Sequence, residues 1–345
     1  MFVRDAPSWS SVFASFRALL PGLALAVLLA AVGTVVGRFV PVLGSAVPGI
    51  VLGAVIAATL RPGARLLPGI AFASKRVLQA SVVLLGTQLS LGAAVRVGVQ
   101  ALPVMIGTLV VCLAAAWLLG RLLGIGGDTT TLIGVGTGIC GASAIAATAP
   151  VIGAAAADVA YAVSTIFLFN ITAVLLFPVI GHLLGMSQTS FGLFAGTAVN
   201  DTSSVVAAAT TYGPVATNHA VVVKLVRTLA IIPITVTLAA IVRRRSTETS
   251  DRRRGILGVV TLVPWFLIGF VIASLLDTVG VIPAAAHPAL AAVSTFLIAV
   301  ALAAIGLSTD LTAIRRAGWR PLALGGALWS LVSLVSLGLQ AALHL

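Results

Sequence analysis

The chain has 345 residues, of which 60% are hydrophobic and 8% are charged, and its formal net charge is +12 at pH 7. A soluble chain would be about 25% charged, so this composition, with a mean hydropathy of +1.19, excludes an ordinary soluble globular protein. The 2 cysteines and 4 histidines show neither a disulfide framework nor metal-ligand spacing. The sequence therefore predicts no metal and no cofactor.

Apolar runs of about 20 residues recur along the chain and are long enough to cross a bilayer, which predicts an all-α polytopic membrane protein. In chain order, the predicted spans are 17–37, 44–60, 68–90, 101–123, 129–151, 156–181, 190–212, 216–242, 256–276, 286–308 and 320–343. We expect about eleven spans (roughly 10–12) in a single membrane domain over residues 1–345. The only long polar connection, 243–255, is too short to form a soluble domain.

Basic residues orient these spans. With a cytoplasmic N-terminus, only Arg38 and Arg96 fall outside. The inner set comprises Arg4, Arg17, Arg61, Arg65, Arg121, Arg243, Arg244, Arg245, Arg252, Arg253, Arg254, Arg315, Arg316 and Arg320. This bias predicts an inner-membrane protein with a cytoplasmic 243–255 loop and an external C-terminus. Since topology accounts for the arginines, they do not indicate nucleic-acid binding, and the loop is expected to face anionic lipid.

The sequence contains an internal repeat. The stretch GTGICGASAIAATAPVIG (136–153) aligns with GTAVNDTSSVVAAATTYG (196–213) at an offset of 60, and the similarity extends the repeat elements to about 129–181 and 190–242. A weaker repeat aligns 84–98 with 304–318. Paired, interrupted helices of this kind line the substrate sites of many transporters.

Each copy carries residues that interrupt a helix. In the first copy, Gly138, Cys140 and Gly141 form the predicted break, and Ser143 follows it. In the second copy, residues of the N-cap type open a half-helix: Asn200, Asp201, Thr202, Ser203 and Ser204. The N-terminus of a half-helix offers free N–H groups and partial positive charge, which suits an anion. The alternative is that the small residues only allow close helix packing.

Charged residues near mid-membrane are expensive and mark candidate sites. Asp201 is the candidate ion-coupling residue, which would take up a proton or a cation, and its alternative role is a structural N-cap. Lys224 and Arg227 share one helix face and lie about midway along the span 216–242. Asp201 could pair with only one of them, so we expect a bound anion to be the partner of the other. The alternative is a structural network.

Three classes of function remain open from the residues alone. The first is a secondary transporter for a small anion. The second is a passive anion channel or a structural membrane protein. The third is an intramembrane enzyme in which Ser143 is the nucleophile and His182 or His219 the base. Both histidines lie near span ends, so we expect no enzyme.

The motifs GTGICGASAIAATAPVI, AGTAVNDTSSVVAAATTYG and VVVKLVR, with FASKRVLQASVVLLGTQLSL at 72–91, closely resemble the YeiH family of proposed sulfate exporters. The resemblance covers about 18–340 and implies two broken helices that cross between a core and a panel domain, as in cation/proton antiporters and bile-acid symporters. It implies export of sulfate or a sulfonate, coupled to protons or sodium, and it leaves a homo-oligomer open. Members often carry histidine where this chain has Asn200, so a histidine-based mechanism is not implied.

One expectation conflicts with that fold. Its two broken helices run in opposite directions, whereas eleven simple spans place the elements near 136 and 196 two spans apart and therefore parallel. Either one element is re-entrant, or the number of spans between them differs, or the pair is not inverted.

Overall fold

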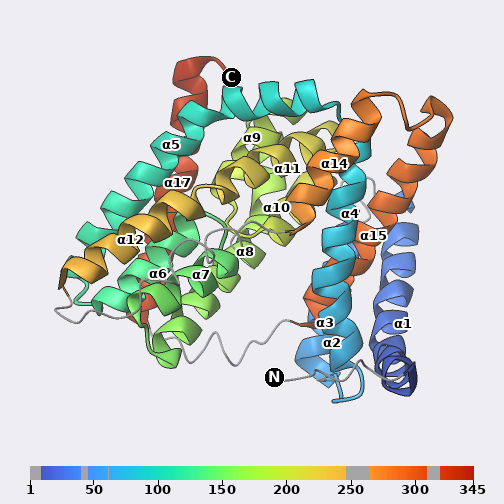
Figure 1. The fold of residues 1–345 in the computed structure, drawn as a ribbon, viewed down its shortest axis with the longest axis horizontal. Helices are drawn as coiled ribbons and strands as arrows, with labels where there is room; N and C mark the ends of the chain where they lie inside the picture. Colours follow the sequence, from blue (N-terminus) through green and yellow to red (C-terminus); the bar gives the residue numbers. More distant parts are fainter. Residues whose placement is uncertain (1–8, 40–45, 61, 246–264, 309–318) are drawn as a thin grey trace, which may run out of the picture. The chain divides into compact units, whose positions relative to one another are not determined.

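The computed structural model describes residues 9–39, 46–60, 62–245, 265–308 and 319–345, and every regular element in these ranges is helical (Figure 1). The all-α prediction is confirmed. Most of the predicted 243–255 loop, the start of the span 256–276 and residues 309–318 of the weaker repeat lie outside the described residues. The chain divides into two compact units. Unit 1 comprises 1–82 and 288–311, and unit 2 comprises 83–287 and 312–345.

Unit 1 is a packed group of long helices. Its elements are α1 (Trp9–Phe39), α2 (Ala46–Leu60), α3 (Leu67–Phe72), a π-helical turn (Ala73–Val77), the start of α4 (Leu78–Leu85) and most of α15 (His287–Leu307). The backbones of α1 and α3 approach closely at Gly22 and Gly69, where a Cβ on Gly22 would lie 2.0 Å from the carbonyl oxygen of Leu66. Only residues without a side chain allow this contact.

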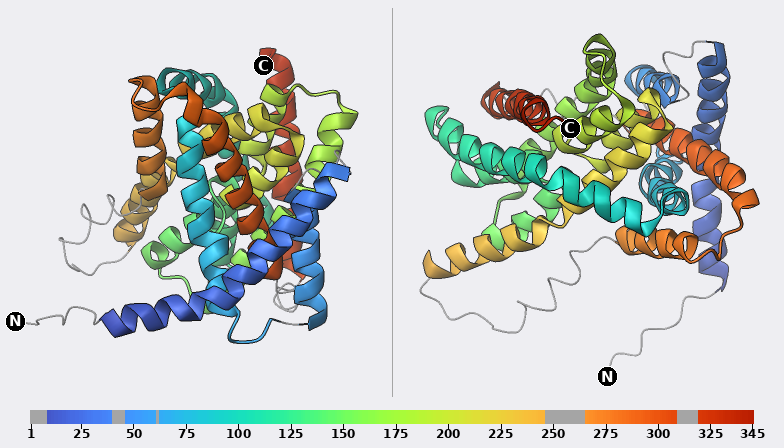
Figure 2. Two further views of the ribbon diagram at one scale, coloured as in Figure 1. Left: turned by 90° about the vertical axis from the view of Figure 1, so that its right-hand side faces the viewer. Right: turned by 90° about the horizontal axis from the view of Figure 1, so that it is seen from above.

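Unit 2 contains both halves of the main repeat. Its continuous helices are α5 (Leu91–Leu122), α8 (Ala156–Leu183), α11 (Pro214–Thr228), α12 (Ile231–Arg245), α14 (Trp265–Thr278) and α17 (Trp319–Leu343). Its short helices are α6 (Gly127–Gly138), α7 (Ala142–Ile152), α9 (Gln188–Ala198) and α10 (Thr202–Tyr212). Helix α17 lies along α5, as the right-hand view of Figure 2 shows.

Each of the eleven predicted spans corresponds to a helical segment within the described ranges, and two of these segments are interrupted. Seven helical stretches are long and apolar enough to cross a membrane. The shorter apolar helices α2 and α14, and the interrupted pairs α6–α7 and α9–α10, complete eleven consecutive segments. The two predicted broken helices are therefore present.

Both interrupted pairs turn back on themselves. In hairpin 1 (α6–α7, 127–152), Thr129 near the start of α6 hydrogen-bonds to Asp158, which follows the end of α7. In hairpin 2 (α9–α10, 188–212), the Tyr212 hydroxyl at the end of α10 donates to the carbonyl of Met186, just before α9, at 2.6 Å. Each hairpin therefore begins and ends at the same level, so each is re-entrant.

This arrangement resolves the conflict over direction. Because α8 is the only helix that crosses between the two hairpins, they enter from opposite sides and the repeat is inverted. If all eleven segments crossed the membrane, the connections 153–155 and 184–187 would each lie on the opposite side of the membrane from the one that the re-entrant hairpins imply. Neither connection contains lysine or arginine, so the charge bias from which the orientation was predicted is unaffected.

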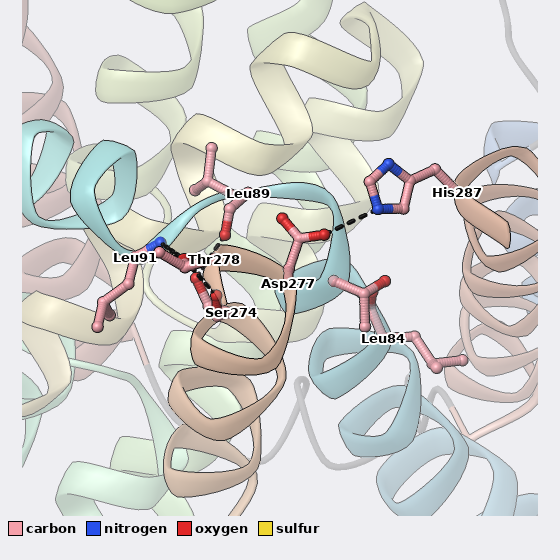
Figure 3. A network of polar contacts seen from close by, with 8 residues as sticks. Leu84, Leu89, Leu91, Ser274, Asp277, Thr278 and His287 are labelled. Atoms are coloured by element: carbon pink, nitrogen blue, oxygen red, sulfur yellow. Dashed lines mark hydrogen bonds and ion pairs between the residues drawn. The ribbon is translucent and has the colours of Figure 1, made fainter. Parts of the chain in front are cut away.

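The turn between α4 and α5 is held by α14 (Figure 3). The Leu91 amide donates to the Thr278 hydroxyl at 2.8 Å, and the Ser274 hydroxyl donates to the carbonyl of Leu89. At the end of the following loop, His287 Nε2 lies 2.8 Å from a carboxylate oxygen of Asp277. These contacts fix the start of α5, which packs against both α6 and α11.

Candidate functional site

The tips of the two hairpins meet. Tip 1 consists of residues 139–141 between α6 and α7, and tip 2 of residues 199–201 between α9 and α10. A Cβ on Gly141 would lie 3.4 Å from the Cβ of Asp201. These two residues are also aligned by the repeat offset of 60, so the inverted repeat brings equivalent positions into contact.

Lys224 on α11 joins the two tips. Its ammonium group donates to the carbonyl of Ile139 and to the carbonyl of Val199, both at 2.8 Å. The residue has 0% exposure. One cation therefore connects a residue of each tip.

Arg227, one helical turn further, repeats this pattern. Its Nε donates to the carbonyl of Gly138 at 2.8 Å. One terminal nitrogen donates to the carbonyl of Thr137 at 3.0 Å, and the other donates to the carbonyl of Thr197. Its exposure is 1%. The guanidinium thus holds the last turns of both α6 and α9.

The reason for both contacts is the polarity of a helix end. The last carbonyls of a helix lack intrahelical partners and carry partial negative charge. Lys224 and Arg227 together place two positive charges against the ends of α6 and α9. A mid-membrane cation costs about 2.5–3.5 kcal/mol, and hydrogen bonds to a charged group contribute about 1.5–3 kcal/mol each, so five such bonds offset that cost. Within the described residues, no ion pair joins Asp201 to either cation.

In tip 2, the amides of Asn200 and Asp201 are satisfied by a side chain, and the amide of Val199 by the carbonyl of Ala195. The Asn170 side-chain oxygen accepts from the amides of Asn200 at 3.1 Å and Asp201 at 3.3 Å. The Asp201 carboxylate caps α10 by accepting from the Ser203 amide at 3.0 Å and from the Ser203 hydroxyl. Thr202 opens the helix beside it and is half-buried.

Asn170 was not identified as a candidate from the sequence. It lies on α8 and is buried. The sequence does carry a signal for this residue. Asn170 is an amide in the middle of an apolar helix, and the aligned position of the second copy is Ala230.

Tip 1 differs from tip 2 because α7 has no side-chain cap. Its N-cap is Gly141, at φ +68° and ψ −132°, a conformation that only glycine adopts readily. Ser143 lies in the first turn of α7 on an exposed face, whereas Cys140 is buried in the cluster that includes Ile231. No carboxylate of the same hairpin caps α7, so the backbone amides at its N-terminus are available as hydrogen-bond donors.

Asn200 is the remaining predicted residue. It is 1% exposed, and neither its side-chain oxygen nor its side-chain nitrogen has a hydrogen-bond partner within the described residues. All ten predicted site residues thus belong to the two tips, the adjoining helix ends or α11. In the same ranges, no group of three metal-ligating side chains occurs.

Residues 21–325 match the family model "Conserved hypothetical protein 698". A UPF0324 membrane protein of Fusobacterium nucleatum is 42% identical over 339 residues, covering 92% of this chain and 96% of the relative. Others from Streptococcus agalactiae (42%, covering 95% and 98%) and Streptococcus mutans (40%, covering 93% and 96%) are similarly close. No solved structure matches the chain. With two re-entrant hairpins in an all-helical fold and these full-length relatives, the chain belongs to the Conserved hypothetical protein 698 (UPF0324) family of membrane proteins.

Proposed function

We propose that this protein is a secondary active transporter for a small anion, sulfate or a sulfonate, which binds at the N-terminus of α7. The observation that carries the proposal is the asymmetry of the joined tips. Lys224 and Arg227 already bind the carbonyls at the ends of α6 and α9. The N-terminus of α7, in contrast, has no side-chain cap. Discontinuous helices present such N-termini to anionic substrate groups in transporters.

The groups around this N-terminus suit an oxyanion. The α7 amides and the Ser143 hydroxyl supply donors, and the helix end carries partial positive charge. Lys224 uses two of its three ammonium hydrogens and Arg227 three of its five in the observed contacts. Both therefore add positive charge beneath the site and keep hydrogens that an anion could accept.

Asp201 supplies the coupling in this proposal. It lies beside Gly141, so its ionised carboxylate would repel an anion at the N-terminus of α7. Protonation of Asp201 would remove that repulsion, so one proton would travel with each anion bound. Sodium in comparable transporters binds at unwound carbonyls and half-helix C-terminal ends, and here Lys224 and Arg227 occupy those groups. This favours proton over sodium coupling.

The resemblance to the YeiH family and the distribution of arginines support the direction and location. We infer export across the inner membrane, because one proton bound with a sulfate dianion leaves a net negative charge that the inside-negative membrane potential drives outward. The N-terminus would lie in the cytoplasm and the C-terminus outside. Three of the four motifs that carry the resemblance, 136–153, 196–213 and VVVKLVR, include the joined tips or lie on α11, so most of the resemblance falls on the elements that build the site.

The enzyme alternative has little geometric support. His182 packs on Tyr212, with ring centroids 4.4 Å apart, at the base of hairpin 2. The 11-residue helix α10 separates that base from the tip by about 16 Å at 1.5 Å per residue. His219 packs near Gly192, in the first half of α9. Neither histidine is placed as a base for Ser143.

Flux into proteoliposomes tests the proposal. Purified protein would be supplied with radiolabelled sulfate, an alkyl sulfonate, phosphate or chloride, under a proton gradient, a sodium gradient or neither. We expect saturable accumulation of sulfate or the sulfonate that follows the proton gradient. Non-saturating flux that follows no ion gradient would instead identify a passive channel.

Asp201→Asn separates coupling from capping. Asparagine is also a good N-cap, so α10 should keep its start and the variant should fold. We expect gradient-driven accumulation to be lost, while exchange of internal for external anion continues. Accumulation equal to the unaltered protein would remove Asp201 from the coupling mechanism.

A further inference from the structure

A groove of about 660 Å³ runs along unit 2 between α5, α6 and α12, away from the residues that join the hairpin tips. The three helices lie at the left of Figure 1. Most of the lining is apolar, and its inner end includes Leu113, Val135 and Ile234. An apolar groove of this size on a membrane protein offers a place for a hydrocarbon chain.

The other end of the groove is positively charged. Arg121 lines it, and the guanidinium carbon lies 4.5 Å from the ring centroid of Trp117, which is 59% exposed. Within the described ranges, no carboxylate pairs with Arg121. The lining part of α12 ends at Ile241, and the helix continues into three arginines, 243–245.

We propose that this groove binds one anionic phospholipid of the inner leaflet, with an acyl chain along α5, α6 and α12 and the phosphate on Arg121. Three observations converge on this ligand. The wall is apolar, its charge is confined to one end, and that end carries an exposed tryptophan, a residue that favours the interface between membrane and water. Clustered arginines beside a helix end attract anionic lipid. A soluble anion would gain nothing from the apolar wall.

The inner end of the groove adjoins the residues that support hairpin 1. Leu113 and Val135 line its inner end and also belong to the cluster of Ile139 and Cys140 beneath tip 1. A bound acyl chain would therefore pack against the residues that support hairpin 1. The binding itself does not depend on the protein being an anion transporter.

Tryptophan quenching tests the proposal directly. The purified protein would be placed in vesicles that contain phosphatidylglycerol or phosphatidylcholine, each brominated near the carbonyl end of its acyl chain. The contribution of Trp117 is the difference between the unaltered protein and Trp117→Phe, which keeps an aromatic face for Arg121. We expect phosphatidylglycerol to be preferred about fivefold at Trp117, as one favourable phosphate contact predicts.

Two variants assign the preference to the groove. Arg121→Gln should abolish the preference for phosphatidylglycerol, whereas Arg96→Gln, the same change at an exposed arginine near the other end of α5, should leave it unchanged. Equal quenching by both lipids, or a preference that survives Arg121→Gln, would overturn the proposal. Absence of quenching by either lipid would also overturn it and would point to a second copy of the chain covering the groove.

Discussion

At the scale of single residues, the site depends on a few backbone and side-chain groups that no regular helix supplies. Gly141 provides a bend that other residues adopt only with strain, and Asn170 satisfies two amides that the break in hairpin 2 leaves free. Lys224 and Arg227 satisfy carbonyls of both hairpins. Each of these groups either allows a break in a helix or satisfies backbone groups that the break leaves without a partner.

Gly141→Ala should reduce both stability and transport because of the backbone alone. A methyl group at this position would be 3.4–3.5 Å from its nearest neighbours, which is ordinary contact. The φ of +68° instead costs a non-glycine residue about 1–3 kcal/mol. Thermal unfolding in detergent measures the loss. Gly338→Ala, inside the last third of α17 with open space around it, is the matched control and should be neutral or stabilising. Equal behaviour of the two variants would show that the bend at Gly141 is not needed.

Arg227→Lys should lower stability as well as transport. Lysine keeps the charge but cannot reach Gly138, Thr137 and Thr197 together, since its donors are on one nitrogen. Losing one or two of these bonds predicts a loss of about 2–4 kcal/mol, read from unfolding. The exposed Arg320 stacks on Trp319, and Arg320→Lys should change stability by at most about 0.5 kcal/mol. If Arg227→Lys kept full stability and only weakened anion affinity, its guanidinium would instead bind the substrate directly.

At the scale of elements, the inverted pair of hairpins is the feature that positions everything else. The sequence predicted the eleven segments, the two breaks and the repeat, because each has a local signal in hydropathy, glycine content or spacing. It could not predict that each broken segment turns back. The interrupted spans 129–151 and 190–212 are each long enough to cross a bilayer. Only tertiary contacts such as those of Tyr212 and Thr129 distinguish a crossing from a hairpin.

Labelling of single cysteines checks the hairpins. Gly126→Cys and Ala155→Cys flank hairpin 1. Thr189→Cys lies at the start of hairpin 2 and Val215→Cys just after its end, and all four positions are exposed. With a membrane-impermeant maleimide, we expect the first two on one side of the membrane and the other two on the opposite side. Eleven simple spans would put Gly126→Cys and Ala155→Cys on opposite sides. The native cysteines, Cys112 and Cys140, are buried and should contribute little background.

At the scale of the whole molecule, the predicted site residues come together although they are up to about 90 positions apart in the chain, as the contact of Arg227 with Thr137 shows. The repeat offset predicted that Gly141 and Asp201 are equivalent, and the inverted arrangement makes them neighbours. The partners of Lys224 and Arg227 could not be predicted. Their ligands are backbone carbonyls, which every residue carries and which therefore leave no mark in a sequence.

The proposed transport depends on an anion binding at the N-terminus of α7, and protection by substrate of a cysteine placed at position 143 tests this most directly. The protein would carry Ser143→Cys with Cys140→Ala, and the rate of modification by a small thiol reagent would be followed as the transported anion is added. Ala155→Cys, in the exposed turn after α7, is the control. We predict that sulfate, or whichever anion the flux assay identifies, slows labelling at position 143 in a saturable manner and leaves position 155 unaffected. Labelling at position 143 that is unchanged at anion concentrations that saturate transport would contradict the account.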